Sequence, residues 1–452
     1  MDPAKLLKYD QRVPRYTSYP TAVQFDPSVG PEQHGRWLQR VGPEQSVSVY
    51  LHVPFCNELC WYCGCNTQVG RHDSTFGNYT DLLCREIDMA AEFFSSRPKV
   101  TWVHWGGGTP SSIGVDRMAR IMAAVQRHCD LLDGAEVAVE LDPRVLSLDE
   151  LARLPRELGV NRASIGVQDF NPRVQAAINR TQPYDLVAAV VARIREEGIA
   201  DLNLDLMYGL PHQRREDFGD TVDQAITLRP ERMTLFGYAH VPWMFSHQNL
   251  IKEADLPDGD ERLALFDEAL RRLEAAGYVH IGLDHFAHPD SELAQAQREG
   301  RMHRNFQGYT TDPAPTLLAF GASAISTLPD GFVQNLSAAR DYMAAIGESH
   351  LATARGVALS DDDRLRARII ERLMCDFEID LEAICGQFGA EVAQFAPDLE
   401  RLAPLIDDDL VAVDGWKVRV LDEGRMLVRA ACVAFDRYHA PDPERPAHAR
   451  AI

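Results

Sequence analysis

The stretch "VSVYLHVPFCNELCWYCGCN" (47–66) joins a run rich in β-branched residues to four cysteines that lie within ten residues of one another. Its first seven residues are typical of a buried β-strand. Cys56, Cys60 and Cys63 follow with the spacing C-x3-C-x2-C, and Cys65 comes two residues later. The order of strand and cysteine loop predicts a binding site at the carboxyl end of a strand, where ligands bind in parallel α/β sheets.

Similar short runs recur along the chain and alternate with longer segments. The strand candidates are residues 47–53, 100–105, 136–142, 162–167, 201–207, 232–238 and 278–284. The segments between them, such as 79–94 and 185–198, carry apolar residues at helical spacing. This alternation is typical of βαβ units, so we predict an α/β fold with a parallel sheet, closed as a full or partial (β/α) barrel.

Residues suited to ligand binding follow the predicted strands. The glycine-rich segment GGGTP (106–110) follows the second strand, and YGLP (208–211) follows the fifth. Acidic and amide residues stand at the ends of the third, fourth and fifth strands: Glu140, Asp142, Gln168, Asp169 and Asp205. The carboxyl ends of parallel strands meet at one edge of a sheet, so these groups are expected close together.

The two ends of the chain differ in texture from the middle. Residues 1–46 include "VPRYTSYPT" and predict an extended arm, and residues 47–350 form the predicted catalytic domain. Residues 351–440 predict helices, a hairpin around Asp414 and Gly415, and a further helix, as in a small winged-helix-like domain. Residues 441–452 predict a loose tail. The acidic "LIDDDL" disfavours the nucleic-acid binding for which winged helices are often used.

Composition excludes several classes of function. The formal net charge is −21, from 46 basic and 67 acidic residues, which opposes binding to nucleic acid or an anionic membrane surface. No apolar run approaches the roughly 18 to 20 residues of a membrane span, and the first residues lack the apolar core of a signal peptide. We therefore expect a cytoplasmic protein with neither nucleic acid nor membrane as partner. The remaining cysteines are isolated and predicted to be small apolar side chains without chemistry: Cys84, Cys129, Cys375, Cys385 and Cys432.

The cysteine cluster admits several interpretations. Nine cysteines in a chain of 452 residues do not suggest a secreted disulfide framework. A structural zinc site needs a second ligand pair, which is not evident, and a thioredoxin-like redox pair leaves Cys56 unexplained. A further alternative, which assigns the cluster no chemistry, is that the four thiols are free and lie this close by coincidence. An iron–sulfur cluster held by three thiolates of one loop accounts for the spacing and leaves one iron of a four-iron cluster without a protein ligand.

These residues resemble a known superfamily. A C-x3-C-x2-C loop directly after the first strand of a partial barrel resembles the radical S-adenosylmethionine enzymes, in which the open iron binds the methionyl amino and carboxylate groups. The segment GGGTP resembles the glycine-rich element that approaches the methionyl amine, where only residues without a Cβ allow such closeness. The resemblance implies a (β/α)6-type partial barrel, a [4Fe–4S] cluster and S-adenosylmethionine as cofactors.

Nearly the whole chain resembles one family within that superfamily, the oxygen-independent coproporphyrinogen III dehydrogenases (oxidases) of haem biosynthesis. The resembling stretches include "PRYTSYPTA" (14–22), "YLHVPFCNELCWYCGCN" (50–66), "HWGGGTP" (104–110), "VELDPR" (139–144), "GVQDFN" (166–171), "NLDLMYGLP" (203–211), "YAHVP" (238–242), "GLDHFAHPDSEL" (282–293) and "HRNFQGYTT" (303–311). The arm, the last stretch and the fourth cysteine, Cys65, discriminate best against related haem chaperones.

The resemblance assigns site residues by matched motif. It implies that Cys56, Cys60 and Cys63 hold the cluster and that S-adenosylmethionine carries the radical, and it leaves the catalytic side chains unknown. It implies further contacts with the one or two S-adenosylmethionine molecules that the family can hold: Tyr50, Tyr62, Gly107, Gly108, Thr109, Glu140, Gln168, Arg180, Asp205, Ala239 and Ile325. From the residues alone, Glu140 and Asp205 could instead cap a helix or pair with Arg180, and spacing gives Cys65 no role.

The implied reaction converts two propionate side chains of coproporphyrinogen III to vinyl groups and gives protoporphyrinogen IX. The resemblance also implies a monomer that uses an electron donor and an electron acceptor. The substrate carries four carboxylates, so local arginines are needed, and the candidates are Arg15, Arg301 and Arg304, with Tyr16, Tyr19 and Phe306 against the macrocycle. The alternatives are a related radical methyltransferase, a haem-degrading enzyme, or a haem chaperone on the same scaffold.

Overall fold

The structure, a computed structural model, describes residues 5, 8–9, 13–43, 45–70 and 72–439. The predicted tail, residues 441–452, lies outside these residues. The chain divides into two compact units. Unit 1 comprises residues 1–24, 277–313 and 359–452, and unit 2 comprises residues 25–276 and 314–358. The predicted domain limits at residues 46, 350 and 440 stay predictions.

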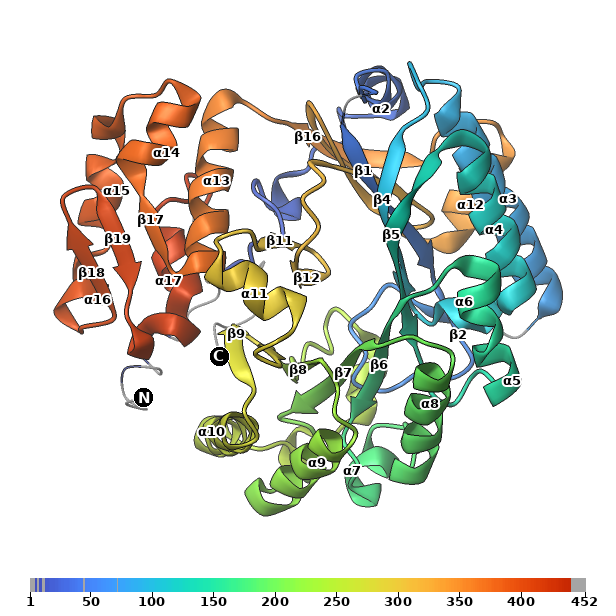
Figure 1. The fold of residues 1–452 in the computed structure, drawn as a ribbon, viewed down its shortest axis with the longest axis horizontal. Coiled ribbons are helices and arrows are strands. Elements are labelled where there is room, and N and C mark those ends of the chain that lie inside the picture. Colours follow the sequence, from blue (N-terminus) through green and yellow to red (C-terminus); the bar gives the residue numbers. More distant parts are fainter. Residues whose placement is uncertain (1–4, 6–7, 10–12, 44, 71, 440–452) are drawn as a thin grey trace. The chain divides into compact units, whose positions relative to one another are not determined.

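Unit 2 is built on a sheet whose strands follow one another in βα order. Neighbouring strands from β1 to β8 pair in parallel. Their bounds are β1 Ser46–Val53, β4 Lys99–Gly107, β5 Asp130–Leu141, β6 Arg162–Gln168, β7 Asp201–Tyr208 and β8 Arg232–Gly237. The parallel α/β prediction is confirmed, and β5 begins six residues earlier than the predicted 136. Figure 1 shows these strands, coloured blue to green, with helices along their outer face.

The helices of unit 2 connect these strands and cover them. Their bounds are α2 Pro31–Leu38, α3 Asp73–Ala91, α4 Val115–His128, α5 Leu148–Leu151, α6 Arg153–Leu158, α7 Pro172–Ala177, α8 Tyr184–Glu196, α9 Arg215–Thr227, α10 Gly259–Ala275 and α12 Ala339–Gly347. α3 and α8 overlap the predicted helical segments 79–94 and 185–198, although α3 begins six residues earlier and ends three residues earlier than predicted. Each buries one largely apolar face. None of the helices in the described part of the chain is both long and apolar enough to span a bilayer.

Helix α2 lies within the segment predicted as an extended arm. Proline at its first position presets the backbone angle of a helix start, and the negative charge of Glu32 in the first turn interacts favourably with the helix dipole. Trp37 and Leu38 are buried at its end. The sequence pattern did not predict this helix, because it begins with proline and its eight residues are too few for a long periodic run.

Strands late in the chain extend the sheet beyond β1. β13 Thr316–Phe320 pairs in parallel with β1. β14 Ile325–Leu328, β15 Gly331–Asn335 and β16 Thr353–Ala358 then continue antiparallel. β14 therefore begins at the edge where β1 and β13 end. This edge is the one that carries the cysteine loop.

Unit 1 contains helices and small antiparallel sheets. Its elements include β9 Val279–Gly282, β10 His285–Ala287, α11 Glu292–Arg298, β11 His303–Asn305, β12 Gly308–Thr310, α13 Asp361–Asp376, β17 Glu378–Asp380, α14 Leu381–Phe388, α15 Ala396–Glu400, α16 Ala403–Asp407, β18 Val411–Asp414, β19 Lys417–Val420 and α17 Val428–Val433. β18 and β19 form the predicted hairpin with Gly415 in the left-handed region, φ +57°. β17 pairs with β19 and was not predicted.

The last predicted strand, 278–284, does not continue the parallel series as a βα unit. β9 ends at Gly282 and pairs antiparallel with β10, with Leu283 at φ +43° in the turn. Two residues cannot make the crossover that a parallel partner requires, so the chain turns back on itself.

A buried carboxylate ties α3 to the late strands of unit 2. Glu86 is 2% exposed and accepts hydrogen bonds from the Gly321 backbone N–H at 2.8 Å, the Asn335 amide at 2.6 Å and the Tyr342 hydroxyl at 2.6 Å. Burial raises the pKa of Glu86 to about 7, against the effect of these three donors. The turn after β13 is thereby fixed to the helical layer.

Replacing Glu86 with alanine should destabilise the fold. Three buried donors would lose their acceptor, so we expect the free energy of unfolding to fall by about 2 to 4 kcal/mol in urea titrations followed by circular dichroism. Asp81 on the same helix is the control, because its exposed pair with Arg120 should contribute less than about 1 kcal/mol. Equal effects of Glu86→Ala and Asp81→Ala would show that the Glu86 contacts do not stabilise the fold.

Candidate cofactor site

The cysteine loop is held by backbone and side-chain bonds at several points. It begins with β2 Phe55–Cys56, which pairs with β3 Gln68–Val69. The Trp61 N–H donates to the Ile178 carbonyl at 3.0 Å, and the Asn179 amide donates to the Leu59 carbonyl at 2.9 Å. The Gln248 amide donates to the Tyr62 carbonyl at 3.0 Å. Contacts from the α7 end and from the segment after β8 therefore fix the loop at the carboxyl edge of the sheet.

The thiols of the loop have distinct surroundings. Cys60 is 7% exposed, Cys56 and Cys63 are half-buried, and Cys65 is exposed. The Cys56 Sγ lies 3.1 Å from the Thr67 hydroxyl, and burial raises the pKa of Cys56. A hydrogen bond from the Cys65 side chain lowers the pKa of Cys63, and the Cys65 N–H also donates to the Cys63 Sγ at 3.4 Å. Cys65 therefore interacts with a predicted ligand, a relation that spacing alone did not reveal.

The glycine-rich segment lies directly against the start of the cysteine loop. The Gly108 N–H donates to the Val53 carbonyl at 2.9 Å, and the Thr109 N–H donates to the Phe55 carbonyl at 2.8 Å. Gly107 has φ +117°, which favours glycine. A Cβ added to Gly108 would lie 2.7 Å from the Phe55 carbonyl oxygen and 3.0 Å from the Cys56 Sγ. Glycine at this position is thus a steric requirement.

Tyr50 and Glu140 border the same glycines. The Gly107 N–H donates to Glu140 Oε2 at 3.3 Å, and His104 Nε2 lies 3.0 Å from Glu140 Oε1. The Tyr50 ring stacks on His104 with centroids 5.9 Å apart. A Cβ on Gly106 would lie 2.8 Å from Glu140 Oε1. The structure therefore brings together Tyr50, Glu140 and the glycines predicted from strands β1, β5 and β4.

Gln168 carries an unsatisfied polar group. It lies at the end of β6 with φ +68°, and its buried Oε1 has no hydrogen-bond partner among the described residues. A buried acceptor without a donor is costly, and left-handed backbone in a non-glycine residue is often found at functional sites. Both observations point to a ligand that supplies a donor.

Arg180 and Asp205 do not pair with each other. The guanidinium of Arg180 donates to Asp142 at 3.0 Å and to the Gly166 carbonyl at 2.6 Å. Asp205 accepts from the Asn203 amide at 2.8 Å, and burial raises the pKa of Asp205 to about 6. The alternative in which Glu140 or Asp205 serves as the carboxylate of Arg180 is wrong, because Asp142 occupies that position.

The remaining predicted contacts lie at the same edge. Tyr62 packs against an apolar cluster that includes Ile178 and Tyr238. Ala239 is exposed just after β8, and Ile325 is the half-buried first residue of β14. Their roles as cofactor contacts stay predictions, since their position alone does not distinguish them from packing residues.

Comparison with known proteins identifies the family. A model of the Radical SAM superfamily matches residues 50–225, and a model of the HemN C-terminal domain matches residues 359–427. The oxygen-independent coproporphyrinogen III oxidase of Bradyrhizobium diazoefficiens is 48% identical over 98% of each chain. The chain belongs to the oxygen-independent coproporphyrinogen III oxidase family.

Other members of the oxygen-independent coproporphyrinogen III oxidase family agree over the same length. The relative from Escherichia coli is 43% identical over 97% of this chain and 95% of its own. A solved structure, described as coproporphyrinogen III oxidase (HemN) from Escherichia coli, a radical SAM enzyme, matches with a TM-score of 0.91 at 41% identity. It covers 95% of this chain and 100% of the other.

The residues of the loop fit the cofactors that radical SAM membership implies, a [4Fe–4S] cluster and S-adenosylmethionine. In the described part of the chain, no group of three or more Cys, His, Asp or Glu residues gathers closely enough to hold a single metal ion. The glycines, where an added Cβ would clash with neighbouring atoms, fit an organic ligand beside the loop. So does the buried Gln168 Oε1, which has no hydrogen-bond partner among the described residues.

Sequence reasoning missed residues around the loop. Arg144 donates to the Cys60 Sγ at 3.6 Å, and Thr109, predicted only for the methionyl group, lies 3.5 Å from the Cys56 Sγ. His104 holds Glu140, as described above. The sequence feature that could have pointed to Arg144 is its position two residues after Asp142, the acid that ends a predicted strand.

The residues proposed for the substrate carboxylates lie in unit 1, where the structure joins two of the three arginines. Arg15 forms an ion pair with Asp284, and Arg304 donates to the Arg15 carbonyl at 3.3 Å while lying over the Tyr309 ring. Arg301 is exposed and pairs with Glu299 at 2.7 Å. The assignment of Arg301 to the substrate stays a prediction.

The aromatic candidates in unit 1 make contacts with the end of the described chain. The Tyr16 hydroxyl donates to Asp436 at 3.0 Å, and the Tyr19 hydroxyl accepts from the Arg437 N–H at 3.1 Å. Phe306 is half-buried between β11 and β12. The contacts of Tyr16 and Tyr19 give both hydroxyls a structural role.

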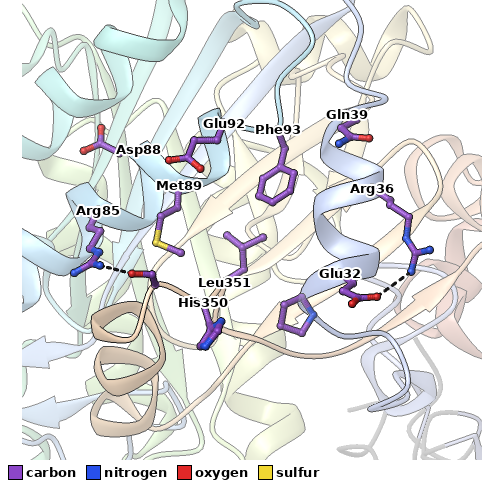
Figure 2. Close-up of a pocket in the computed structure, with 12 residues that line it drawn as sticks. Glu32, Arg36, Gln39, Arg85, Asp88, Met89, Glu92, Phe93, His350 and Leu351 are labelled. Carbon is purple, nitrogen blue, oxygen red and sulfur yellow. Dashed lines mark hydrogen bonds and ion pairs between the residues drawn. The ribbon is translucent and has the colours of Figure 1, made fainter.

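A separate cavity of about 700 Å³ lies elsewhere in unit 2 (Figure 2). Its lining comes from α2, α3 and residues 349–351, so it does not include the cysteine loop. Arg85 donates to Ser349 at 2.5 Å, and Glu32 pairs with Arg36 at 3.7 Å. The mixture of acidic and basic groups selects no particular class of ligand.

Proposed function

We propose that the protein is a radical S-adenosylmethionine enzyme that converts coproporphyrinogen III to protoporphyrinogen IX by oxidative decarboxylation of two propionate side chains. The observation that carries the proposal is the contact between the cysteine loop and the glycine cradle, with Gly108 packed against Phe55 and Cys56. The agreement with named oxidases over nearly the full chain supports the choice of substrate.

The loop residues hold and orient the cofactors in this proposal. Cys56, Cys60 and Cys63 ligate three irons, and the fourth is left for S-adenosylmethionine. Gly107, Gly108 and Thr109 receive the methionyl group. When bound, the cluster supplies one electron to the sulfonium and so releases a 5′-deoxyadenosyl radical.

Polar residues at the strand ends then position the nucleoside portions. Glu140 and Gln168 offer acceptors for amino or hydroxyl groups, and Arg180 and Asp205 offer a fixed charge and a buried carboxylate. Tyr50, Tyr62, Ala239 and Ile325 provide surface around the ligand. We assign these residues to the one or two S-adenosylmethionine molecules that the family can hold.

The chemistry requires a radical because the propionate β C–H bond is unactivated. The radical that bound S-adenosylmethionine would supply can take that hydrogen atom, which leaves the unpaired electron on the β-carbon, one methylene away from the carboxylate. Loss of carbon dioxide and transfer of one electron to an acceptor then complete each vinyl group. The protein's contribution is position and the exclusion of water.

The cellular setting is part of the proposal. We propose a cytoplasmic monomer that takes electrons from a separate donor and passes the electron of each decarboxylation to a separate acceptor. Size-exclusion chromatography with light scattering tests the monomer, for which a mass near 50.6 kDa is expected.

Anaerobic turnover tests the proposed reaction. The reconstituted protein is incubated with S-adenosylmethionine, a chemical reductant, an electron acceptor and coproporphyrinogen III. Two carbon dioxide molecules per substrate and a divinyl product are expected. Methylated product, ring opening, or tight haem binding without turnover would instead support the related methyltransferase, the haem-degrading enzyme or the haem chaperone.

A further inference from the structure

Two arginines approach the same thiol of the cysteine loop. Arg180 Nη1 donates to the Cys60 Sγ at 3.4 Å, and Arg144 Nη2 donates to it at 3.6 Å. The side chains of Arg180 and Arg144 are 8% and 16% exposed. Cys60 is also the most buried of the three predicted ligands. Two cationic donors therefore face one sulfur where water screens them weakly.

Asp142 fixes the position of both arginines. Its carboxylate accepts from Arg144 Nε at 2.9 Å, from Arg144 Nη2 at 2.7 Å and from Arg180 Nη1 at 3.0 Å. It also accepts from the Arg144 backbone N–H at 3.0 Å. Two guanidinium groups and one carboxylate leave one net positive charge beside Cys60. Glu58 lies 3.5 Å from Arg144 on the exposed side and offsets this charge weakly.

The planar guanidinium of Arg144 explains how one side chain contacts both Asp142 and Cys60. Two parallel N–H bonds to Asp142 fix the plane of the guanidinium. Nη2 carries a second hydrogen, which is free to point at the Cys60 Sγ once the first is engaged by Asp142. A lysine ammonium keeps the charge but cannot reproduce this orientation.

A hydrogen bond to a ligating thiolate changes the redox behaviour of a cluster. The reduced cluster carries one more negative charge than the oxidised one, so a nearby cation and N–H donor stabilise it more. Hydrogen bonds to the sulfurs and net charge are recognised determinants of iron–sulfur potentials. Of the two arginines at Cys60, Arg180 is already assigned to S-adenosylmethionine, whereas Arg144 has no other assigned role.

We propose that Arg144, held by Asp142, raises the reduction potential of the cluster through its hydrogen bond to the Cys60 thiolate. This inference rests on the cluster assignment in the proposed function. Arg144 acts through Cys60 and is a positioning residue. It makes the cluster easier for the electron donor to reduce.

The test is an anaerobic redox titration of the reconstituted protein, without S-adenosylmethionine or substrate, followed by electron paramagnetic resonance. The variants are Arg144→Met, Arg144→Gln and Arg144→Lys. We expect Arg144→Met to lower the one-electron reduction equilibrium about tenfold, which is a shift of about 59 mV to more negative potential. Arg144→Lys, which keeps the charge without the planar guanidinium, should shift less. The control is Arg156→Gln, which removes an exposed arginine paired with Glu197 and should leave the potential unchanged.

An unchanged potential in Arg144→Met, with full iron content, would overturn the inference. If Arg144→Met does not retain iron, unchanged potentials in both Arg144→Gln and Arg144→Lys would overturn it equally. The expected shift in a protein that releases no carbon dioxide from coproporphyrinogen III would support the role of Arg144 and reject the proposed reaction. A wild-type protein that binds no cluster would reject both.

Discussion

Replacing Cys60 with serine should remove the broad iron–sulfur absorbance of the anaerobically reconstituted protein and abolish 5′-deoxyadenosine formation. The same loss is expected for Cys56→Ser and Cys63→Ser, because each thiolate is assigned to one iron of the same cluster. The effect should be complete, since a serine hydroxyl is not ionised at neutral pH and is a poor ligand for iron. Iron content, the visible spectrum and electron paramagnetic resonance measure it.

Two other cysteines serve as controls for this prediction. Cys65→Ser should retain iron, because Cys65 interacts with the Cys63 sulfur without being assigned as a ligand. Cys84→Ser should leave iron and activity unchanged, because Cys84 is an isolated, half-buried thiol near the Arg120 carbonyl. Full iron retention in any one of the Cys56, Cys60 or Cys63 variants would contradict the ligand assignment.

Replacing Gly108 with alanine should lower activity about 100-fold, in line with the cost of misplacing reacting groups by about 1 Å. The new methyl group would meet the Phe55 carbonyl oxygen at 2.7 Å and the Cys56 sulfur at 3.0 Å. The clash involves backbone, which cannot rotate away as a flexible side chain does. The loop and the methionyl pocket should therefore separate, and S-adenosylmethionine binding measured by equilibrium dialysis should weaken.

Gly77→Ala is the matched control for Gly108→Ala. Gly77 lies within α3, and a Cβ there meets nothing within 4 Å. Alanine at this position should keep full activity and raise the free energy of unfolding by about 0.5 to 1 kcal/mol. Wild-type binding of S-adenosylmethionine by Gly108→Ala would show that the close packing at this glycine does not shape the pocket.

Much of unit 2 was predictable because its signals are local. The β-branched runs and the helical spacing each fix one element, and their alternation fixes a parallel sheet. The edge residues followed from the same logic, since Glu140, Gln168 and Asp205 all stand where strands end. Helix α2 was missed because its eight residues give too short a pattern. β9 was misassigned to the parallel series because periodicity predicts a strand but does not identify its partner.

The contacts around the site were less predictable because they are tertiary. Asp142 and Arg144 follow β5, whereas Arg180 follows α7, and only the fold brings both arginines to Cys60. The sequence suggested Glu140 or Asp205 as a carboxylate partner for Arg180, whereas the structure gives Asp142, since several acids end neighbouring strands. The sequence pattern did not single out Glu86, and only the fold shows three donors around it.

The most direct test of the central claim follows one hydrogen atom. Coproporphyrinogen III labelled with deuterium at the propionate β-carbons is incubated anaerobically with the reconstituted protein, S-adenosylmethionine, reductant and electron acceptor, and the 5′-deoxyadenosine is analysed by mass spectrometry. We predict one deuterium in each 5′-deoxyadenosine and one labelled molecule for each vinyl group formed. Unlabelled 5′-deoxyadenosine alongside vinyl product, or vinyl product without any 5′-deoxyadenosine, would contradict the account.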